Sequence, residues 1–368
     1  MIPGVRRACA LLLAAGFSAC GGKVVVDGLA ATDSTGTASA GNGGSTGIGG
    51  DSTGSAPSGS GSSGTTSGGG GYSGGTGSGG SSVIPLAYTL TEYVTSPQAL
   101  WKGLVHTSAI DSSGRLFVSD GEVVYAIKDG VPSIYLTYAE LKTAASDDLP
   151  SISSLDVGPD DRLYILDGGA PYNILVSHGP HDAALHLAVA SESLTWPDHI
   201  GVESPDRVLL VTSEGGLYEV TVGGTKQVYT SSAFQNAMGC GVRDFAVTQN
   251  GYFYFLPGCT NSPILGGTTK GGSVDVLVTL ADLDENYAWW FGAVAHHPKG
   301  GAVANLTGTA YYLDASGKPT ELSMNPAMST IKETGYDFPL FDGRPIEVGA
   351  SGEIYLIGSD RIYCAIPQ

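Results

Sequence analysis

Two carboxylates and one imidazole stand at exceptional positions in this chain. When its six repeated segments are aligned, one column is made of small residues except for two acids: Ala109, Asp156, Gly201, Ala246, Ala295 and Glu347. In the next column His296 stands among aliphatic residues. Carboxylate oxygens and imidazole nitrogens bind divalent cations such as Ca²⁺ or Zn²⁺. Asp156, His296 and Glu347 are therefore a candidate metal site.

Polar side chains of both signs gather where the first strand of each repeat begins. They are His106, Asp198, His199, Arg243, Asp244 and Arg344. The tryptophans Trp101, Trp196, Trp289 and Trp290 fall in the connectors that lead into these strands. Aromatic faces beside polar groups suit a sugar ring, a peptide or a cation. We predict a ligand-binding mouth that includes Trp101, Trp196 and Trp290; the alternative is solvated loop ends whose rings pack onto the strands.

The elements that must position these residues come from a repeated phrase. A short apolar strand, a polar turn and a second apolar strand recur six times, and the last turn residues lie 45 to 52 residues apart: Gly114, Asp161, Asp206, Gly251, Gly300 and Gly352. A period of this size with strands and almost no helix indicates one four-stranded sheet per repeat. The sequence therefore predicts an all-β fold, a six-bladed β-propeller of four-stranded blades.

The last repeat is one strand short, because the chain stops at Gln368 after a third strand near 361–366. The segment 86–94 precedes the first repeat and has the character of a fourth strand. Pairing the two would close the ring and remove a free sheet edge. We therefore expect the N-terminal strand to complete the last blade.

The six phrases together resemble the Gly-Ile-Ala-Val-Asp-x-x-Gly phrase of the NHL-repeat and gluconolactonase-like (SMP-30-like) propellers, over 83–368. That group contains lactonases, lyases and non-catalytic binding modules, so the resemblance alone does not select a chemistry. Its lactonases hold a metal with a Glu, Asn and Asp set that does not map onto these columns. The folded part, 83–368, also lacks a Gly-x-Ser-x-Gly elbow, a Cys-x-x-Cys pair and a His-Glu-x-x-His motif, and no catalytic residue is assigned.

The net charge of −18 belongs to the folded part, because the charges before Val83 cancel. Such an acidic surface argues against nucleic acid and against an anionic lipid surface as partners. Protein, peptide or glycan ligands at the propeller mouth remain open.

The first 82 residues predict export and anchoring. A basic start, a short apolar run and Phe17-Ser-Ala-Cys20 indicate a signal peptide over 1–19 and resemble a bacterial lipobox, which implies a lipid on Cys20. Residues 20–82 are rich in Gly, Ser and Thr, and such a composition predicts a disordered tether. The expected location is the cell envelope, as an outer-membrane lipoprotein whose only membrane contact is its lipid.

Cys240 and Cys259 flank a hairpin that turns at 249–250, so an antiparallel register places them opposite each other. We expect a disulfide there, and a buried thiol at Cys364. As a whole the sequence favours a lipid-anchored, non-catalytic binding module. The alternative is a metal-dependent hydrolase or lyase of the lactonase-like group, with its site in the axial channel.

Overall fold

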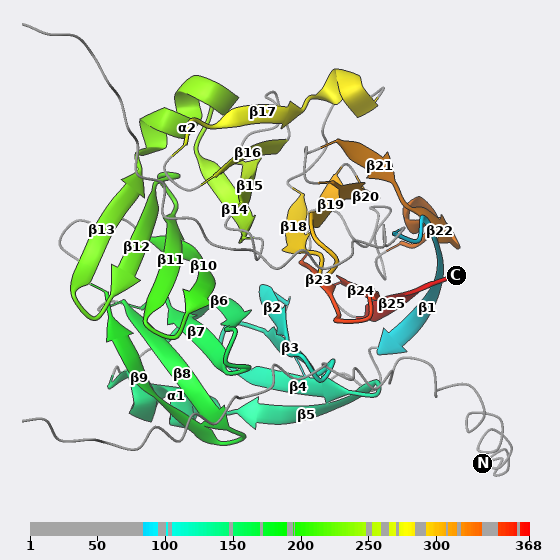
Figure 1. Ribbon diagram of the computed structural model, residues 1–368. Coiled ribbons are helices and arrows are strands. Elements are labelled where there is room, and N and C mark those ends of the chain that lie inside the picture. The colour runs from blue at the N-terminus through cyan, green and yellow to red at the C-terminus, as the bar shows by residue number, and fades with distance from the viewer. Residues whose placement is uncertain are drawn as a thin grey trace, which may run out of the picture. The chain divides into compact units, whose positions relative to one another are not determined.

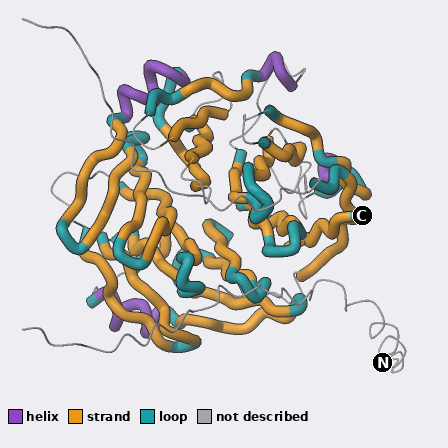
Figure 2. Tube along the Cα trace, viewed as in Figure 1, coloured by secondary structure: helices purple, strands orange, loops and turns teal. Residues whose placement is uncertain are grey.

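The computed structural model is a ring of six β-sheets around a common axis (Figure 1). It describes residues 84–94, 101, 105–146, 150–169, 172–189, 194, 196–247, 252–258, 265–269, 272–283, 292–306, 308–314, 318–332, 345–358 and 361–368. The predicted signal peptide, Cys20 and tether lie outside the described residues. Figure 2 shows that strands make up nearly all of the described ring, with short helices at its periphery.

The first three blades each contain four consecutive strands, counted from the axis outward. Blade one consists of β2 (Thr107–Ile110), β3 (Leu116–Ser119), β4 (Val124–Lys128) and β5 (Val131–Leu136). Blade two consists of β6 (Ile152–Val157), β7 (Leu163–Asp167), β8 (Asn173–Gly179) and β9 (Asp182–Ala188). Blade three consists of β10 (Pro197–Ser204), β11 (Arg207–Thr212), β12 (Leu217–Thr221) and β13 (Gly224–Tyr229).

Blades four and five repeat this order, and blade six departs from it. Blade four consists of β14 (Val242–Val247), β15 (Tyr252–Pro257), β16 (Leu265–Thr269) and β17 (Asp275–Val278). Blade five consists of β18 (Ala293–His296), β19 (Ala302–Leu306), β20 (Thr309–Leu313) and β21 (Pro319–Glu321). Blade six consists of β23 (Ile346–Val348), β24 (Ile354–Ile357), β25 (Ile362–Pro367), β1 (Ala87–Val94) and β22 (Ser323–Asn325). The prediction of a six-bladed propeller is confirmed.

Closure of the ring by the N-terminal strand is also confirmed. β1 pairs with β25 in antiparallel register, from Tyr88 opposite Pro367 to Val94 opposite Ile362. The structure adds a contact that the sequence did not predict, because β22 pairs with the other edge of β1 in parallel register. β1 is therefore hydrogen-bonded on both sides, and the last blade has five strands.

The repeated turn residue owes its type to backbone geometry. It adopts a positive φ in four of the hairpins that join the first two strands of a blade: Gly114 (74°), Asp161 (62°), Gly300 (94°) and Gly352 (88°). In each, its N–H donates a 2.9 Å hydrogen bond to the carbonyl three residues earlier. Positive φ favours Gly and tolerates Asp, which explains the residues of the repeated phrase.

The core is divided among the junctions between neighbouring blades. Six clusters of buried side chains each combine residues of two adjacent blades, and the second strands β3, β7, β19 and β24 are buried along their whole length. Sheets covered on both faces produce the continuous apolar runs that the sequence displays. The small column of the innermost strands follows from the same packing: a Cβ on Gly201 would lie 2.8 Å from the ring of Phe245.

Helices occur between blades, which the repeated phrase did not predict. α1 (Tyr138–Ala145) follows blade one, and α2 (Ser231–Met238) follows blade three. Two 3₁₀ turns also occur: Leu280–Leu283 follows the last strand of blade four, and Met328–Thr330 follows β22 of blade six. None of the helices in the described ranges is long and apolar enough to cross a membrane.

Candidate functional site in the axial cavity

A cavity of about 1510 Å³ follows the axis of the ring, and all six innermost strands contribute to its wall. Residues at equivalent positions of the six innermost strands lie at equal depth, so the side chains that line the cavity form layers. His106, Asp198 and Arg243 are exposed at one end, where the strands begin. Asp156, Asp244 and Glu347 line the cavity between the two ends. An apolar ring interrupted by one histidine lines the other end: Ile110, Val157, Val202, Val247, His296 and Val348.

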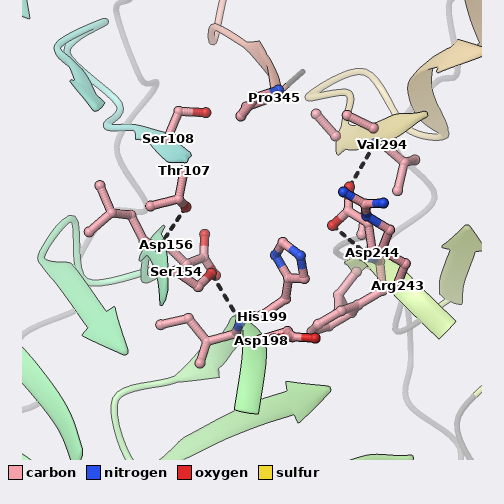
Figure 3. Close-up of a pocket in the computed structure, with 18 of the residues that line it drawn as sticks. Thr107, Ser108, Ser154, Asp156, Asp198, His199, Arg243, Asp244, Val294 and Pro345 are labelled. Carbon is pink, nitrogen blue, oxygen red and sulfur yellow. Dashed lines mark hydrogen bonds between the residues drawn. The ribbon is translucent and has the colours of Figure 1, made fainter. Parts of the chain in front are cut away.

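The innermost strands are held together by side chains that accept backbone hydrogen bonds from the next blade. The innermost strand is the edge of its sheet, so the N–H groups on its unpaired edge need acceptors outside the blade. Thr107 Oγ1 accepts from the Leu155 N–H of blade two at 2.9 Å, and Ser154 Oγ accepts from the Ile200 N–H of blade three at 3.2 Å. Figure 3 shows these contacts on the cavity wall.

Two aspartates make a stronger version of this contact. Asp156 accepts from its neighbour Val157 at 2.8 Å and from Val202 of blade three at 2.6 Å, one N–H on each oxygen. Asp244 does the same with Phe245 at 2.8 Å and with Val294 of blade five at 3.1 Å. Both carboxylates therefore have a structural role, whatever else they do in the cavity.

Burial makes it costly for these aspartates to be charged. It raises the pKa of Asp156 to about 7, against the opposing effect of its two N–H donors. Burial also raises the pKa of Asp244, opposed first by the nearby His199 and then by the N–H donors and Arg243. Near neutral pH Asp156 exchanges its proton readily, which is uncommon for an aspartate and typical of functional sites.

Glu347 occupies the corresponding column in blade six, but it caps no backbone amide among the described residues. Its Oε1 accepts a 2.7 Å hydrogen bond from the Ser108 hydroxyl of blade one. Burial, with the charges of Asp156 and Asp244, raises the pKa of Glu347 to about 8 against the opposing effect of the Ser108 hydrogen bond. The three acids come from alternate blades and influence one another across the cavity. At neutral pH Glu347 is mainly protonated and can donate a proton.

His199 projects into the cavity from β10, between the wall that carries Asp156 and the wall that carries Asp244 (Figure 3). It lies near enough to Asp244 for its positive charge to lower the pKa of that carboxyl. A neutral imidazole can act as a general base, and a neighbouring carboxylate stabilises the imidazolium that results. The cavity thus contains a proton acceptor and a proton donor.

The predicted mouth residues are only partly brought together. His106, Asp198, His199, Arg243 and Asp244 all line the cavity. Asp198 and Asp244 both lie near enough to Arg243 for their charges to act on it. Arg344 and Trp290 lie outside the described residues, so their roles stay predictions.

The two described tryptophans differ from each other. Trp196 is 69 % exposed, lies two positions before the cavity-lining Asp198 in the chain, and has a positive φ of 42°. Trp101 is not placed as expected: it is only 7 % exposed and packs edge-on against Tyr125, with ring centroids 6.0 Å apart, between blades six and one. Its indole fills a gap in the apolar core, so the prediction of a ligand contact at Trp101 is wrong.

The candidate metal ligands are not gathered into one cluster. Among the described residues, no three His, Cys, Asp or Glu side chains lie close enough together to hold a metal ion. Both oxygens of Asp156 already accept amide hydrogen bonds, and His296 belongs to the layer beyond Glu347. Burial lowers the pKa of His296, and no described carboxylate opposes that effect. These residues do not fit a ready-made metal site, and a divalent cation stays a prediction.

The cysteines are only partly described. The Gly258 N–H donates to the Gly241 carbonyl at 2.9 Å, which is the register that the disulfide prediction assumed. Cys259 lies outside the described residues, so its bond to Cys240 stays a prediction. Cys364 is 0 % exposed in β25, as expected for a buried thiol.

Ser108 is the site residue that sequence reasoning missed. Its hydroxyl contacts Glu347 across the closure of the ring, 239 positions away in the chain. The column alignment contained a signal, because Ser108 is the polar member of an otherwise apolar row: Leu155, Ile200, Phe245, Val294 and Ile346. A polar residue in a buried row needs a partner, and the adjacent column supplied one in Glu347.

Fold and site together define an acidic six-bladed propeller with a polar axial cavity. No protein-family profile matches the chain, and no curated protein matches its sequence. Solved structures do match. A gluconolactonase from Xanthomonas campestris aligns with a TM-score of 0.52 and 12 % identity over 76 % of this chain and 89 % of its own. A second protein, described as a putative gluconolactonase, aligns with a TM-score of 0.52 and 9 % identity over 77 % and 93 %.

A streptogramin B lyase aligns with a TM-score of 0.49 and 10 % identity over 76 % of this chain and 99 % of its own. At such identities, likeness to the two gluconolactonase structures concerns the fold alone. The chain has the six-bladed propeller fold of gluconolactonase-like proteins, as its repeated phrase predicted.

Proposed function

We propose that the axial cavity is an active site and that the protein is a hydrolase or lyase acting on a small polar molecule. The observation that carries this proposal is the pairing of a proton donor and a proton acceptor in one cavity. Glu347, with a pKa of about 8, is the donor, and His199 beside Asp244 is the acceptor. The proposal is consistent with the gluconolactonases that share the fold, and it replaces the non-catalytic function that the sequence favoured.

The same two groups serve either reaction. In hydrolysis of a lactone or ester, His199 takes a proton from water as the water oxygen bonds to the carbonyl carbon. The ring or ester C–O bond then breaks, and Glu347 gives its proton to the departing oxygen. In an elimination, His199 takes the proton from carbon, a C–O bond breaks, and Glu347 again protonates the leaving oxygen. The Ser108 hydroxyl holds one oxygen of Glu347, which leaves the other to carry the proton.

Metal dependence, which the lactonase-like group implies, is not built into this mechanism. The described residues do not gather a metal cluster, and no step is assigned to a metal ion. The residues of the chain supply proton transfer, orientation and a polar enclosure.

Turnover by the full chain tests the proposal. The substrates are a panel of γ- and δ-lactones and simple esters, followed by proton release at constant pH, and neutral β-hydroxy esters, followed by the absorbance of the alkene. We expect Glu347→Gln to lower kcat/KM at least 100-fold, within the range for loss of a general acid. Glu321→Gln, the same change at an exposed position on β21, should leave kcat/KM unchanged. Equal activity of Glu347→Gln and the unmodified chain would disprove the role of Glu347.

A non-catalytic binding module is the second candidate, and Trp196 is the observation in its favour. A tryptophan that is 69 % exposed and has a positive φ is uncommon, because both features cost free energy. At the mouth it would offer an aromatic face to a glycan, peptide or protein ligand. Absence of turnover on the whole panel, together with glycan or peptide binding that Trp196→Ala abolishes, would favour this candidate.

We further propose that the propeller works in the cell envelope. Cleavage before Cys20 would leave a lipid-anchored outer-membrane protein, with 20–82 as the tether of the propeller. Metabolic labelling with a radioactive fatty acid, lost in Cys20→Ala, tests the anchor. Labelling of Cys20→Ala would contradict it.

A further inference from the structure

The charge inside the cavity is strongly one-sided. Six carboxylate residues contribute to its wall, and only two guanidinium groups do: Asp156, Asp198, Glu203, Glu214, Asp244 and Glu347 against Arg207 and Arg243. The protein as a whole carries a net charge of −18, so its field adds to the local excess. A cavity of one sign attracts ligands of the opposite sign and rejects those of its own.

The two arginines do not neutralise the middle of the cavity. Arg207 lies beyond it and forms ion pairs with Glu203 at 2.8 Å and with Glu219 at 3.0 Å. Arg243 is exposed at the mouth, near Asp198 and Asp244. Asp156 and Glu347 have hydrogen-bond donors as partners but no cationic group among the described residues. When these two carboxyls are ionised, no cationic side chain among the described residues pairs with them.

We propose that the ligand of the axial cavity is an organic cation, an amine whose ammonium group is attracted into the cavity by the carboxyls that line it, Asp156, Asp244 and Glu347. This inference goes beyond the proposed function: an ammonium group would favour the ionised form of Glu347, so the amine is a ligand of the same cavity and not the molecule that receives the proton of Glu347. It depends on the cavity itself and on the unequal charge of its wall.

The layer next to the acids indicates the rest of the ligand. Val157, Val202 and Val247 belong to an apolar ring on the cavity wall, adjacent to the column of Asp156 and Glu347. An alkyl or ring segment bonded to the ammonium group would lie against these side chains and bury apolar surface. At about 1510 Å³ the cavity exceeds the volume that one small molecule needs, so size does not restrict the ligand to a bare ion.

The pKa values of the buried acids are consistent with the same ligand. Burial keeps the pKa of Asp156 at about 7, and burial together with the charges of Asp156 and Asp244 keeps that of Glu347 at about 8. An ammonium group among them would lower both pKa values, since an opposite charge favours the ionised form. A carboxylate ligand would do the reverse and would have to carry a proton into the cavity.

The experiment compares three probes of equal length with the full chain at pH 8: hexylamine, 1-hexanol and hexanoate. Isothermal titration, or ligand-observed NMR for weak binding, gives each affinity. We expect hexylamine to bind at least tenfold more tightly than 1-hexanol, and hexanoate more weakly than either. Glu347→Gln should weaken hexylamine about tenfold and leave 1-hexanol unchanged.

Asp275→Asn is the matched control, because it removes one negative charge from an exposed position on β17 outside the cavity wall. It should leave hexylamine binding unchanged, whereas an equal loss in Asp275→Asn and Glu347→Gln would mean that only the net charge matters and would overturn the inference. Equal binding of hexylamine and 1-hexanol, or tighter binding of hexanoate, would also overturn it. So would Ca²⁺ or Zn²⁺ that occupies the cavity and is not displaced by hexylamine.

The result is separable from the proposed function. If lactone or ester turnover is lost in Glu347→Gln while hexylamine shows no advantage over 1-hexanol, the active site stands and the cationic ligand is rejected. If hexylamine binds as expected and no substrate is turned over, the cation site stands and the hydrolase or lyase is rejected.

Discussion

The hydroxyl of Ser108 donates a 2.7 Å hydrogen bond to Oε1 of Glu347, and this contact joins the innermost strands of the first and last blades. The two residues lie on β2 and β23, which meet only because β1 closes the ring. The same bond holds the carboxyl that we assign as proton donor. Ring closure and the proposed chemistry therefore depend on one another at this point.

Glu347 makes the stability of the propeller depend on pH. Its folded-state pKa of about 8 lies above the ordinary value of 4.5, so its contribution to stability is fully present below about pH 4.5 and is lost as the pH rises to about 8. Glu347→Gln removes this loss. Its free energy of unfolding should exceed that of the unmodified chain by about 2 kcal/mol at pH 9 and differ little at pH 5; partial solvation by the cavity keeps the effect below the full pKa shift. Urea unfolding at the two pH values measures the difference.

The matched variant for this comparison is Glu321→Gln, which changes an exposed glutamate on β21. It should give equal stability changes at pH 5 and pH 9. A Glu347→Gln protein whose advantage is the same at both pH values would show that Glu347 is already ionised in the folded state.

Thr107 provides a test of the contacts between innermost strands. Its hydroxyl is 5 % exposed and accepts the Leu155 N–H of the next blade at 2.9 Å. Thr107→Val keeps the shape and removes the acceptor, so a buried N–H loses its partner. We expect a loss of about 1–2 kcal/mol in the free energy of unfolding. Thr107→Ser keeps the hydroxyl and should lose less than half as much; equal losses would mean that the methyl group, not the hydrogen bond, matters.

Much of the fold could be predicted because the repeated phrase has a local physical cause. Gly114, Gly300 and Gly352 stand where the hairpin requires a positive φ, and the apolar runs after them fill the space between blades. The helices could not be predicted from the period, because they lie outside the repeated unit. α1 did have a local signal: Thr137 and Glu140 form a capping box at its first turn. β22 has only three residues and pairs with a strand more than 230 positions away, so no sequence pattern predicts this pairing.

The repeat alignment could predict the site residues on the innermost strands, but it could not predict those in the loops. A strand alternates with a period of two, so one register placed Asp156 and Glu347 at equal depth, and the structure has them in the same row. Trp101 lies in a connector, where no period fixes the direction of a side chain, and there the expectation was wrong. The electrostatic link among Asp156, Asp244 and Glu347 also needed three dimensions, since it acts across the axis between alternate blades.

Because β1 closes the ring, we predict that the propeller does not fold without this strand. β1 is hydrogen-bonded to β25 on one edge and to β22 on the other, and it buries Tyr88 and Leu90 in the junction with blade five. Deletion of 83–96 from the full chain should abolish cooperative thermal unfolding and the near-UV circular dichroism of packed aromatic rings. Deletion of 57–70, of the same length in the predicted tether, should change neither. A folded product of the first deletion would refute the closure.

His297 makes the propeller sensitive to acid. Its side chain is 0 % exposed, its Nδ1 accepts the Lys299 N–H at 3.1 Å, and its Nε2 has no hydrogen-bond partner among the described residues. Burial, together with the charges of Lys299 and His296, lowers the pKa of this imidazole to about 4. Because the unfolded chain binds a proton near pH 6.5 and the folded chain does not, the contribution of His297 to stability falls as the pH drops from about 6.5 to about 4.

The loss over this range should amount to about 3 kcal/mol from this residue. His297→Asn keeps an acceptor for the Lys299 N–H and removes the titration, so urea midpoints between pH 4 and 7 should decline less steeply in the variant than in the unmodified chain. His178→Asn makes the same change at an exposed position and should keep the original slope. The packing lost around Tyr312, whose ring lies 5.5 Å from the imidazole, lowers stability equally at every pH and does not affect the slope. An unchanged slope in His297→Asn would assign the acid sensitivity to other groups.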